Sequence, residues 1–412
     1  MESGKFVNLN ASQRMIPLGE ASERILEISL TAPKRAQRKE AQRMNISLVL
    51  DRSGSMHGEK LENVKRAALH VLDLLRDGDQ LSLVVFDDQV EVISPRVILD
   101  PTERKFLRRR IEQIRSGGST NLSGGWLAGC LEVASGELEG TVNRTILLTD
   151  GLANVGVTDI EALTGQAAEI AARGVSTTTL GVGLGFNEHL LEAMANNGRG
   201  NFYFIESASA IPAIFAREMS ELSALTAKDI ELTLQLPEGW DCWIFGGWKV
   251  TREGNIWRLF VGSLVSEQTM NLYVRLKIPA RQDQLTEKLS LMVRGKDEQD
   301  AIFEQKVEFA MQVTPTEISA QEAVDSRVME AFTSVEITDI ANESLKLERA
   351  GHRGRAQEQL QKYIYENKAS MSPDMIDDYN NMASRMGMGM AEDDRKQSHY
   401  RNYNQKRQRN TE

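Results

Sequence analysis

Short apolar runs alternate with amphipathic stretches between residues 44 and 222. The apolar runs contain few polar positions, which is typical of strands buried on both faces of a sheet. They lie at residues 45–51, 81–86, 145–150, 175–183 and 201–205. The stretches between them repeat their apolar residues with a helical period, at residues 60–75, 102–115, 123–135, 159–173, 187–197 and 209–222. This alternation predicts βαβ units and a mostly parallel sheet covered on both faces. A shorter run at 89–93 predicts a short strand at an edge.

Past about residue 225 the pattern becomes an alternation of apolar and polar residues, punctuated by Gly and Pro. The alternating segments lie at residues 232–240, 249–264, 269–279, 288–295 and 303–313. A period of two residues predicts antiparallel strands in a sheet or sandwich of modest size. Four tryptophans fall in this part of the chain: Trp240, Trp243, Trp248 and Trp257. We expect them to pack in a core rather than to form an aromatic binding surface.

The two ends of the chain carry further elements. An alternating stretch at 24–32 predicts a strand, and the charged run at 33–43 is interpreted as a solvated connector. Residues 317–368 are helical in pattern and are split in two at Gly351 and Gly354. Ser372, followed by Pro373, predicts the start of another helix. The final segments are interpreted as a flexible methionine-containing linker at 384–394 and a basic helix or frayed tail at 395–409.

Bulk composition narrows the classes of function. The chain has 412 residues and a formal net charge of -10, and this acidic balance argues against broad nucleic-acid binding. The first residues lack the apolar core of a signal peptide, and no apolar run is long enough for a membrane span. Two cysteines far apart in sequence, Cys130 and Cys242, argue against a thiolate zinc site and suit a reducing compartment. We therefore expect a cytoplasmic protein.

Short oxygen-bearing side chains follow three of the predicted strand ends. Asp51, Ser53 and Ser55 come directly after the first buried strand, in a D-x-S-x-S spacing. Thr120 lies in the glycine-rich loop SGGSTNLSGG, and Asp150 ends the strand TILLTD. Because ligands of parallel α/β sheets bind at the carboxyl ends of the strands, these segments are expected to converge on one crevice.

The residue types suit a small hard cation. Mg²⁺ takes oxygen ligands in near-octahedral geometry and keeps several waters. Ser and Thr hydroxyls supply short neutral ligands, and the carboxylates of Asp51 and Asp150 supply charge directly or through water. With only two acids nearby, the metal keeps uncompensated positive charge, so a carboxylate from outside can fill an open position. Glycines such as Gly54 and Gly151 let the loops approach the ion.

These residues resemble the metal-ion-dependent adhesion site of the von Willebrand factor A (VWA) family, over about residues 44 to 222. All five motif positions are matched: Asp51, Ser53, Ser55, Thr120 and Asp150. The resemblance implies that the two serines and the threonine contact Mg²⁺ or Mn²⁺ and that the aspartates act largely through water. Ser119 precedes Thr120 and competes for its role. His57, just after the metal loop, is interpreted as a rim residue and not as a general base.

The layout of the whole chain resembles bacterial VWA proteins similar to inter-alpha-trypsin inhibitor heavy chains. The resemblance implies an α/β, doubly wound, mostly parallel (Rossmann-like) VWA sheet with an additional β-sandwich and a C-terminal helical segment. The expected bounds are 1–43 for a β segment joining the sandwich, 44–222 for the VWA domain, 225–315 for the β-sandwich and 316–412 for the helical region with its basic tail.

The functional hypothesis is a binding module and not an enzyme. A protein partner supplies Asp or Glu to the metal, and the chain acts as an intracellular scaffold or adaptor. Resemblance alone suggests AAA+ ATPases or kinase and phosphatase signalling proteins as partners. The acidic charge argues against a nucleic-acid partner, and the lack of a long apolar run argues against a membrane. Two alternatives stay open. One is a metal-assisted hydrolase that activates water, and the other is a structural assembly protein whose site is incidental.

Overall fold

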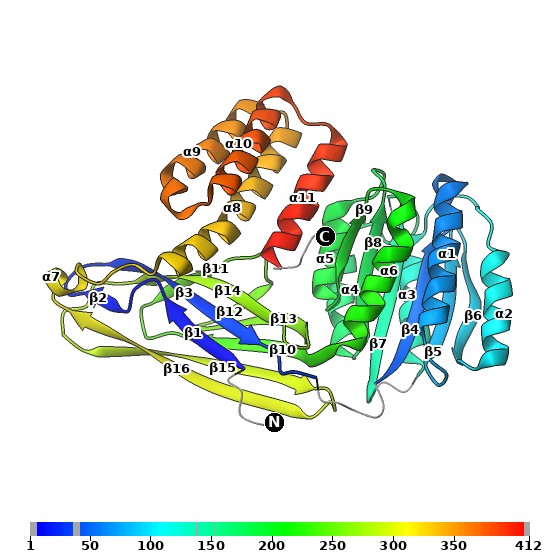
Figure 1. Ribbon diagram of the computed structural model, residues 1–412, viewed down its shortest axis with the longest axis horizontal. Coiled ribbons are helices and arrows are strands. Elements are labelled where there is room, and N and C mark those ends of the chain that lie inside the picture. Colours follow the sequence, from blue (N-terminus) through cyan, green and yellow to red (C-terminus); the bar gives the residue numbers. More distant parts are fainter. Residues whose placement is uncertain (1–5, 36–41, 137–138, 153, 408–412) are drawn as a thin grey trace. The chain divides into compact units, whose positions relative to one another are not determined.

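The computed structural model describes residues 6–35, 42–136, 139–152 and 154–407. Its internal contacts divide the chain into two compact units, which can be followed by colour along the sequence in Figure 1. The α/β unit comprises Arg35–Leu225 and Glu298–Asp300. The sandwich unit comprises Met1–Lys34, Thr226–Asp297 and Ala301–Glu412.

One six-stranded sheet in the order β6-β5-β4-β7-β8-β9 forms the centre of the α/β unit. Its strands are β4 (Arg43–Asp51), β5 (Gln80–Phe86), β6 (Val90–Ile98), β7 (Thr141–Thr149), β8 (Ser176–Val182) and β9 (Phe202–Ile205). All neighbouring strands are parallel except β5 and β6. The chain proceeds outward from β4 on both sides, so the order reverses between β4 and β7, which is where sheets of this kind bind ligands.

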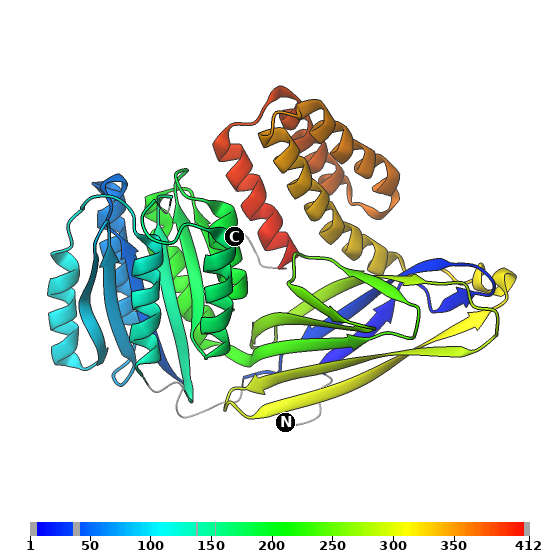
Figure 2. The same ribbon diagram turned by 180° about the vertical axis from the view of Figure 1, so that it is seen from behind.

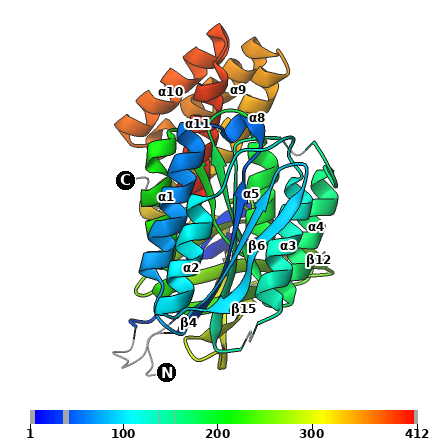
Figure 3. The same ribbon diagram turned by 90° about the vertical axis from the view of Figure 1, so that its right-hand side faces the viewer.

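Helices cover both faces of this sheet. They are α1 (Glu59–Leu74), α2 (Pro101–Glu112), α3 (Leu122–Ala134), α4 (Ile160–Ala172), α5 (Glu188–Asn197) and α6 (Ile211–Ser223). Apolar residues of α1, α2 and α6 share one core with alternate residues of β4. In Figure 3, α1 and α2 lie on one side of the sheet, and α3 and α4 lie on the other. The predicted class of fold is confirmed.

The packing of α3 depends on small residues. A Cβ atom on Gly129 would lie 2.2 Å from Cγ2 of Val49 in β4, so only glycine lets the helix lie this close to the sheet. Val49 itself is fully buried, and every β4 residue from Met44 to Asp51 is buried. Because both faces of β4 are covered, its sequence is a continuous apolar run and not an alternating one.

The edge strand β6 is longer than its sequence predicted. The prediction was a short strand at 89–93, but the strand continues through Pro95 to Ile98. It pairs with β5 alone, antiparallel and with two irregularities in register. An edge position tolerates proline, because the missing N–H leaves no ladder partner unsatisfied on the open side.

Two antiparallel sheets form the sandwich unit, in the orders β1-β3-β14-β11 and β12-β13-β10-β15-β16-β2. Among the described strands of this unit, the short β2 pairs in parallel, with β16. The strands are β1 (Val7–Ala11), β2 (Met15–Pro17), β3 (Ser22–Thr31), β10 (Leu225–Gln235), β11 (Asp241–Ile244), β12 (Val250–Glu253), β13 (Ile256–Val265), β14 (Thr269–Ile278), β15 (Thr286–Asp297) and β16 (Ile302–Thr314). β3 pairs with β14 over ten residues, which ties the N-terminal segment to a strand some 240 residues later in sequence.

The tryptophans of this unit divide between core and surface. Trp240 and Trp257 lie in the core between the sheets, and Trp248 packs against it partly buried. Trp243 on the edge strand β11 is 67% exposed, so the expectation of core packing was wrong for this residue. Successive side chains of a strand point to opposite faces. Trp243 points outward, whereas its neighbours Cys242 and Ile244 are partly buried.

The C-terminal part contains the helices α7 (Thr316–Ser319), α8 (Ser326–Arg349), α9 (Arg353–Asn367), α10 (Pro373–Met388) and α11 (Glu392–Lys406). α8 packs on β3 and β14 through an apolar cluster that includes Phe332 and Tyr273. The helices that follow can be traced in Figure 2, which shows the chain from behind. The basic end forms α11 up to Lys406 and continues to Arg407, and residues 408 and 409 lie outside the described range.

The segment 384–394 is not a flexible linker, contrary to its prediction. α10 continues through Met388, and α11 begins at Glu392. Met386 and Met390 are buried in a core shared with α8 and α9. Methionine is unbranched and adapts to irregular gaps, so a methionine-rich stretch can pack closely between helices even with glycines beside it. In the described part of the chain, no helix combines the length and the apolar character that crossing a membrane requires.

Candidate metal centre

Asp51 is the last residue of β4, and its carboxylate is fully buried and held from two sides. The backbone N–H of Ser53 donates to Oδ1 at 2.8 Å, and Thr149 Oγ1 at the end of β7 donates to Oδ2 at 2.5 Å. These bonds orient the carboxylate before any ion arrives. Burial raises the pKa of Asp51, while the hydrogen bonds from Ser53 and Thr149 act in the opposite direction.

Asp150 follows β7 and joins the serine loop to the same place. Ser55 Oγ donates to Asp150 Oδ1 at 2.6 Å, and the hydroxyl oxygens of Ser53 and Ser55 are 3.2 Å apart. Asp51, Ser53 and Asp150 are buried, whereas Ser55 is exposed. The four residues therefore form a contiguous polar cluster that opens to solvent at Ser55.

The loop that carries Thr120 is bound to the end of β4 by backbone hydrogen bonds. Gly117 N–H donates to Arg52 O at 2.7 Å, and Gly54 N–H donates to Gly118 O at 2.9 Å. A Cβ atom on Gly117 would lie 1.8 Å from Asp87 Oδ2, so a larger residue would displace the loop. The glycines of this loop thus fix where the next residues fall.

Thr120 completes the group of sequence-predicted residues. The position of a Cβ atom on Gly151 lies 3.3 Å from Thr120 Oγ1 and 4.0 Å from Asp51 Oδ2, so both oxygens border the same small volume. Thr120 is 4% exposed, whereas Ser119 is an exposed residue. The geometry favours Thr120 over Ser119 for a role at this site.

Three residues of the site were not singled out in the sequence. Thr149 bonds to Asp51, and Asn154 Oδ1 accepts from the backbone N–H of Thr120 at 2.9 Å. Lys60, in the first turn of α1, forms an ion pair with Asp150 Oδ2. The sequence could have indicated Lys60, because this lysine lies nine residues after Asp51, at the start of the helix that follows the serine loop.

The oxygen donors of this cluster suit a hard cation that accepts neutral ligands. Within the described residues, no group of three or more His, Cys, Asp and Glu side chains is placed to hold a metal ion. The cluster here instead combines two carboxylates with three hydroxyls. Such oxygens, with waters in the remaining positions, fit Mg²⁺ or Mn²⁺ better than a thiophilic metal.

Two other features lie outside this cluster. His57 Nδ1 is 3.1 Å from Ser116 Oγ at the exposed rim, in keeping with its interpretation as a rim residue.

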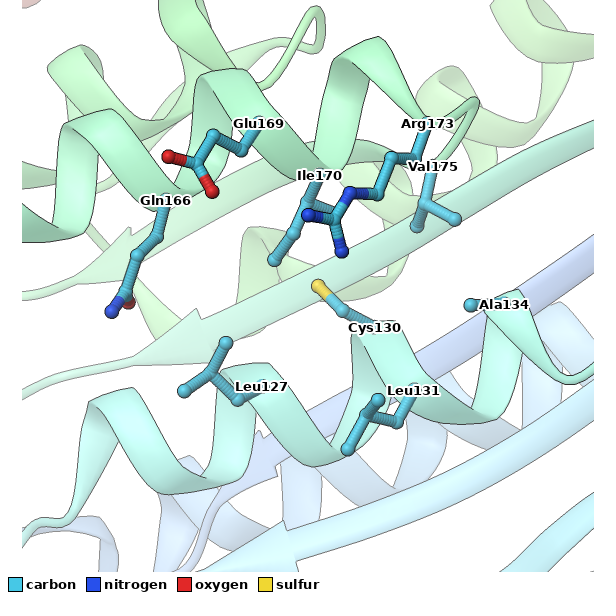
Figure 4. Close-up of a pocket in the computed structure, with 9 residues that line it drawn as sticks. All are labelled: Leu127, Cys130, Leu131, Ala134, Gln166, Glu169, Ile170, Arg173 and Val175. Atoms are coloured by element: carbon cyan, nitrogen blue, oxygen red, sulfur yellow. The ribbon is translucent and has the colours of Figure 1, made fainter.

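A pocket of about 270 Å³ lies between α3 and α4, and Figure 4 shows Cys130 and Arg173 directed toward it. Its lining is mostly apolar, and burial raises the pKa of the Cys130 thiol to about 12, which suppresses the thiolate at neutral pH.

Comparisons with known proteins identify the α/β unit. Residues 45–217 match the family described as von Willebrand factor type A domain. An uncharacterized protein of Synechocystis sp. is 30% identical over 260 residues, which cover 58% of this chain and 59% of that protein. Inter-alpha-trypsin inhibitor heavy chain H1 of Sus scrofa is 33% identical over 174 residues, which cover 40% of this chain and 19% of the heavy chain.

A solved structure extends the likeness beyond this domain. The structure described as von Willebrand factor type A from Catenulispora acidiphila has a TM-score of 0.69 and 17% sequence identity. The match covers 88% of this chain and 87% of that one, so the fold likeness includes the sandwich and the helices. Residues 45–217 therefore match a von Willebrand factor type A domain, and the chain is similar to a protein of Synechocystis sp. and to an inter-alpha-trypsin inhibitor heavy chain.

Proposed function

We propose that the VWA domain is a divalent-metal-dependent protein-binding module. Asp51, Ser53, Ser55, Thr120 and Asp150 hold Mg²⁺ or Mn²⁺, and an Asp or Glu of a partner protein completes the shell. Domains of this family commonly mediate metal-dependent protein–protein interaction. The whole chain would then act as a scaffold or adaptor that positions this module.

One observation carries the proposal: oxygens from three separate loops converge at the switch point of the sheet. The contact of Ser55 Oγ with Asp150 Oδ1, at 2.6 Å, links loops that are 95 residues apart in sequence. The neighbouring Thr120 oxygen comes from a third loop. A shared cation accounts for short oxygen-bearing side chains from three loops meeting at one place.

The charge balance supports an acidic partner. Two carboxylates offset the charge of a divalent ion only when both are fully available, and Lys60 already shares Asp150. The metal would therefore retain positive charge toward solvent, on the side where Ser55 is exposed. An external carboxylate is the ligand that best meets that charge.

The proposal treats the site as a binding site rather than a catalytic one. Hydrolysis needs a base that receives a proton from the attacking water. In the proposal the carboxylates of Asp51 and Asp150 hold the metal, and the nearby His57 lies at the exposed rim, with Nδ1 3.1 Å from Ser116 Oγ. Phosphatase or peptidase turnover that disappears in Asp51→Ala would contradict this part of the proposal.

The cellular setting belongs to the same proposal. A scaffold inside the cytoplasm, working beside AAA+ ATPases or kinase and phosphatase signalling proteins, is suggested by family resemblance. Both cysteines are free thiols, which accords with a reducing compartment. Affinity capture from native lysate in Mg²⁺ and in EDTA, read by mass spectrometry, tests the partner class directly.

The metal-binding test is a thermal shift. Mg²⁺ at 100 times its Kd should stabilise the VWA domain by about 2.7 kcal/mol. The Ser53→Ala/Ser55→Ala variant and the Thr120→Ala variant should lose this stabilisation, because each removes hydroxyl ligands. Differential scanning fluorimetry with and without Mg²⁺ measures the effect.

Ser119→Ala is the matched control, because it removes an exposed hydroxyl from the same loop. Its thermal shift should equal that of the natural protein. A full shift in Thr120→Ala together with none in Ser119→Ala would assign the ligand to Ser119 instead. An unchanged shift in every variant would mean that the ion binds elsewhere.

A further inference from the structure

Four large aliphatic side chains are exposed on the loops that border the candidate metal centre. Leu152 is 57% exposed and Leu184 is 48% exposed, and Val157 and Ile160 are exposed at 37% and 39%. Leu152 and Val157 lie between β7 and α4, Ile160 begins α4, and Leu184 lies between β8 and α5. These four residues are called the aliphatic rim below.

The two leucines of the rim are tied to the metal residues through adjacent glycines. A Cβ atom added to Gly151, the residue before Leu152, would lie 3.3 Å from Thr120 Oγ1. Gly185, next to Leu184, is packed so tightly that its Cβ position is 2.5 Å from the backbone oxygen of Asp150. Both leucines therefore lie one residue from a direct contact with the site.

Residues 154–157, between β7 and α4, are hydrogen-bonded to the segment that carries Thr120 and to the start of α3. The backbone N–H groups of Asn154 and Val155 both donate to Thr120 O at 3.2 Å. The N–H of Val157 donates to Ser123 Oγ at 2.9 Å, at the start of α3. The apolar side chains are thus presented by a loop whose backbone is bonded to the Thr120 segment, and they are not exposed by fraying.

Isolated exposed aliphatic residues are ordinary on protein surfaces. Leu131 on α3 and Ile98 at the end of β6 are examples in the same unit, with 70% and 58% exposure. The rim differs because its members follow two neighbouring strand ends, beside a centre that attracts carboxylates. Protein-binding surfaces combine exposed apolar residues with polar groups.

We propose that the VWA domain recognises a partner segment in which the metal-binding Asp or Glu is flanked by a large aliphatic or aromatic residue. This inference rests on the proposed function. The carboxylate satisfies the charge of the metal, and the flanking side chain covers Leu152 and Leu184. Metal contact alone would accept any accessible acid, so the aliphatic rim supplies the selectivity among acidic partners.

A peptide library tests this specificity. Peptides with a fixed central Asp and randomised flanking positions are selected on the full chain in Mg²⁺ and, in parallel, in EDTA. Selection in Mg²⁺ should enrich Leu, Ile, Val, Met or Phe within two positions of the Asp. The selected peptide should bind at least tenfold more weakly to the Leu152→Ser/Leu184→Ser variant, while the Mg²⁺ thermal shift of that variant stays intact.

Leu131→Ser is the matched control, since it removes an exposed leucine that lines the pocket between α3 and α4 instead. It should bind the selected peptide as the natural protein does. Mg²⁺-dependent selection without apolar preference, or equal affinity in the double variant, would overturn the inference and leave the proposed function standing. Selection that gives the same peptides in Mg²⁺ and in EDTA would overturn both.

Discussion

At the scale of single residues, the most informative contact is the ion pair between Lys60 and Asp150. Asp150 is buried, and the lysine side chain that reaches it is 37% exposed. A divalent ion at the candidate centre must share Asp150 with this ammonium group or displace it. We therefore expect Lys60 to weaken metal binding at this centre.

Replacing Lys60 with alanine should strengthen Mg²⁺ binding. Removing one positive charge a few ångströms from the ion relieves repulsion of about 1 kcal/mol in a water-like dielectric, which corresponds to roughly fivefold tighter binding. Isothermal titration calorimetry at low ionic strength measures the change. Lys65→Ala is the control, because its ammonium pairs with Glu62 on the same helix, and its Mg²⁺ affinity should not change. Weaker binding in Lys60→Ala would show that the lysine supports the site.

At the scale of elements, a buried ion pair joins α11 to α8. Arg395 donates to both carboxylate oxygens of Glu348, at 2.6 and 3.0 Å. The backbone N–H of Met390 donates to the same group, at 3.0 Å. The Glu348 side chain has no exposed surface, and Arg395 holds its pKa below the usual range. The last helix is thus secured by a carboxylate that must stay ionised.

Arg395→Ala should destabilise the sandwich unit by about 3 kcal/mol at pH 7, because it leaves a buried carboxylate without its partner. A lowered pKa in the folded state gives stability that is present above the ordinary Glu pKa of about 4.3 and is lost as pH falls through the folded value. The difference between the variant and the natural protein should therefore shrink below about pH 4. Urea denaturation followed by circular dichroism measures the loss of stability at pH 7 and its decrease below about pH 4.

The matched control for this pair is Arg385→Ala. Arg385 pairs with Asp394 where both side chains are well exposed, at 46% and 36%. Surface pairs of this kind contribute roughly 0–1 kcal/mol. Comparable losses in the two variants would mean that burial of Glu348 does not govern the docking of α11.

At the scale of the whole molecule, the candidate centre lies in one of two compact units. The residues of the centre come from β4, β7 and the loops beside them, all within the α/β unit. Metal binding adds stability to the elements that supply ligands. Metal binding should therefore stabilise the α/β unit more than the sandwich unit.

Hydrogen exchange read by mass spectrometry can detect this difference. Mg²⁺ should slow amide exchange in the loops after β4 and β7 and in the segment before α3, because the ion crosslinks them. The strands β15 and β16 of the sandwich unit should exchange at the same rate with Mg²⁺ and with EDTA. Slower exchange across both units, or in neither, would contradict a metal centre confined to the α/β unit.

The sequence by itself determined most elements of the α/β unit and the five candidate metal residues. Buried strands and amphipathic helices are encoded by local patterns, so the strand ending at Asp51 and the helix from Glu59 were predictable. The order of the parallel strands places Asp51 and Asp150 at one edge, and the structure brings them together with Ser55 and Thr120. Their binding of a metal stays a prediction.

Only the tertiary structure decided what depends on partners distant in sequence. The pairing of β3 with β14, the extension of β6 through Pro95 and the burial of Met386 each depend on a neighbour that no local window contains. The same holds for Lys60, whose pattern is that of any exposed helical lysine until α1 brings it to Asp150. Local patterns set the preference of a segment, but burial and charge pairing depend on which surfaces meet when the chain folds.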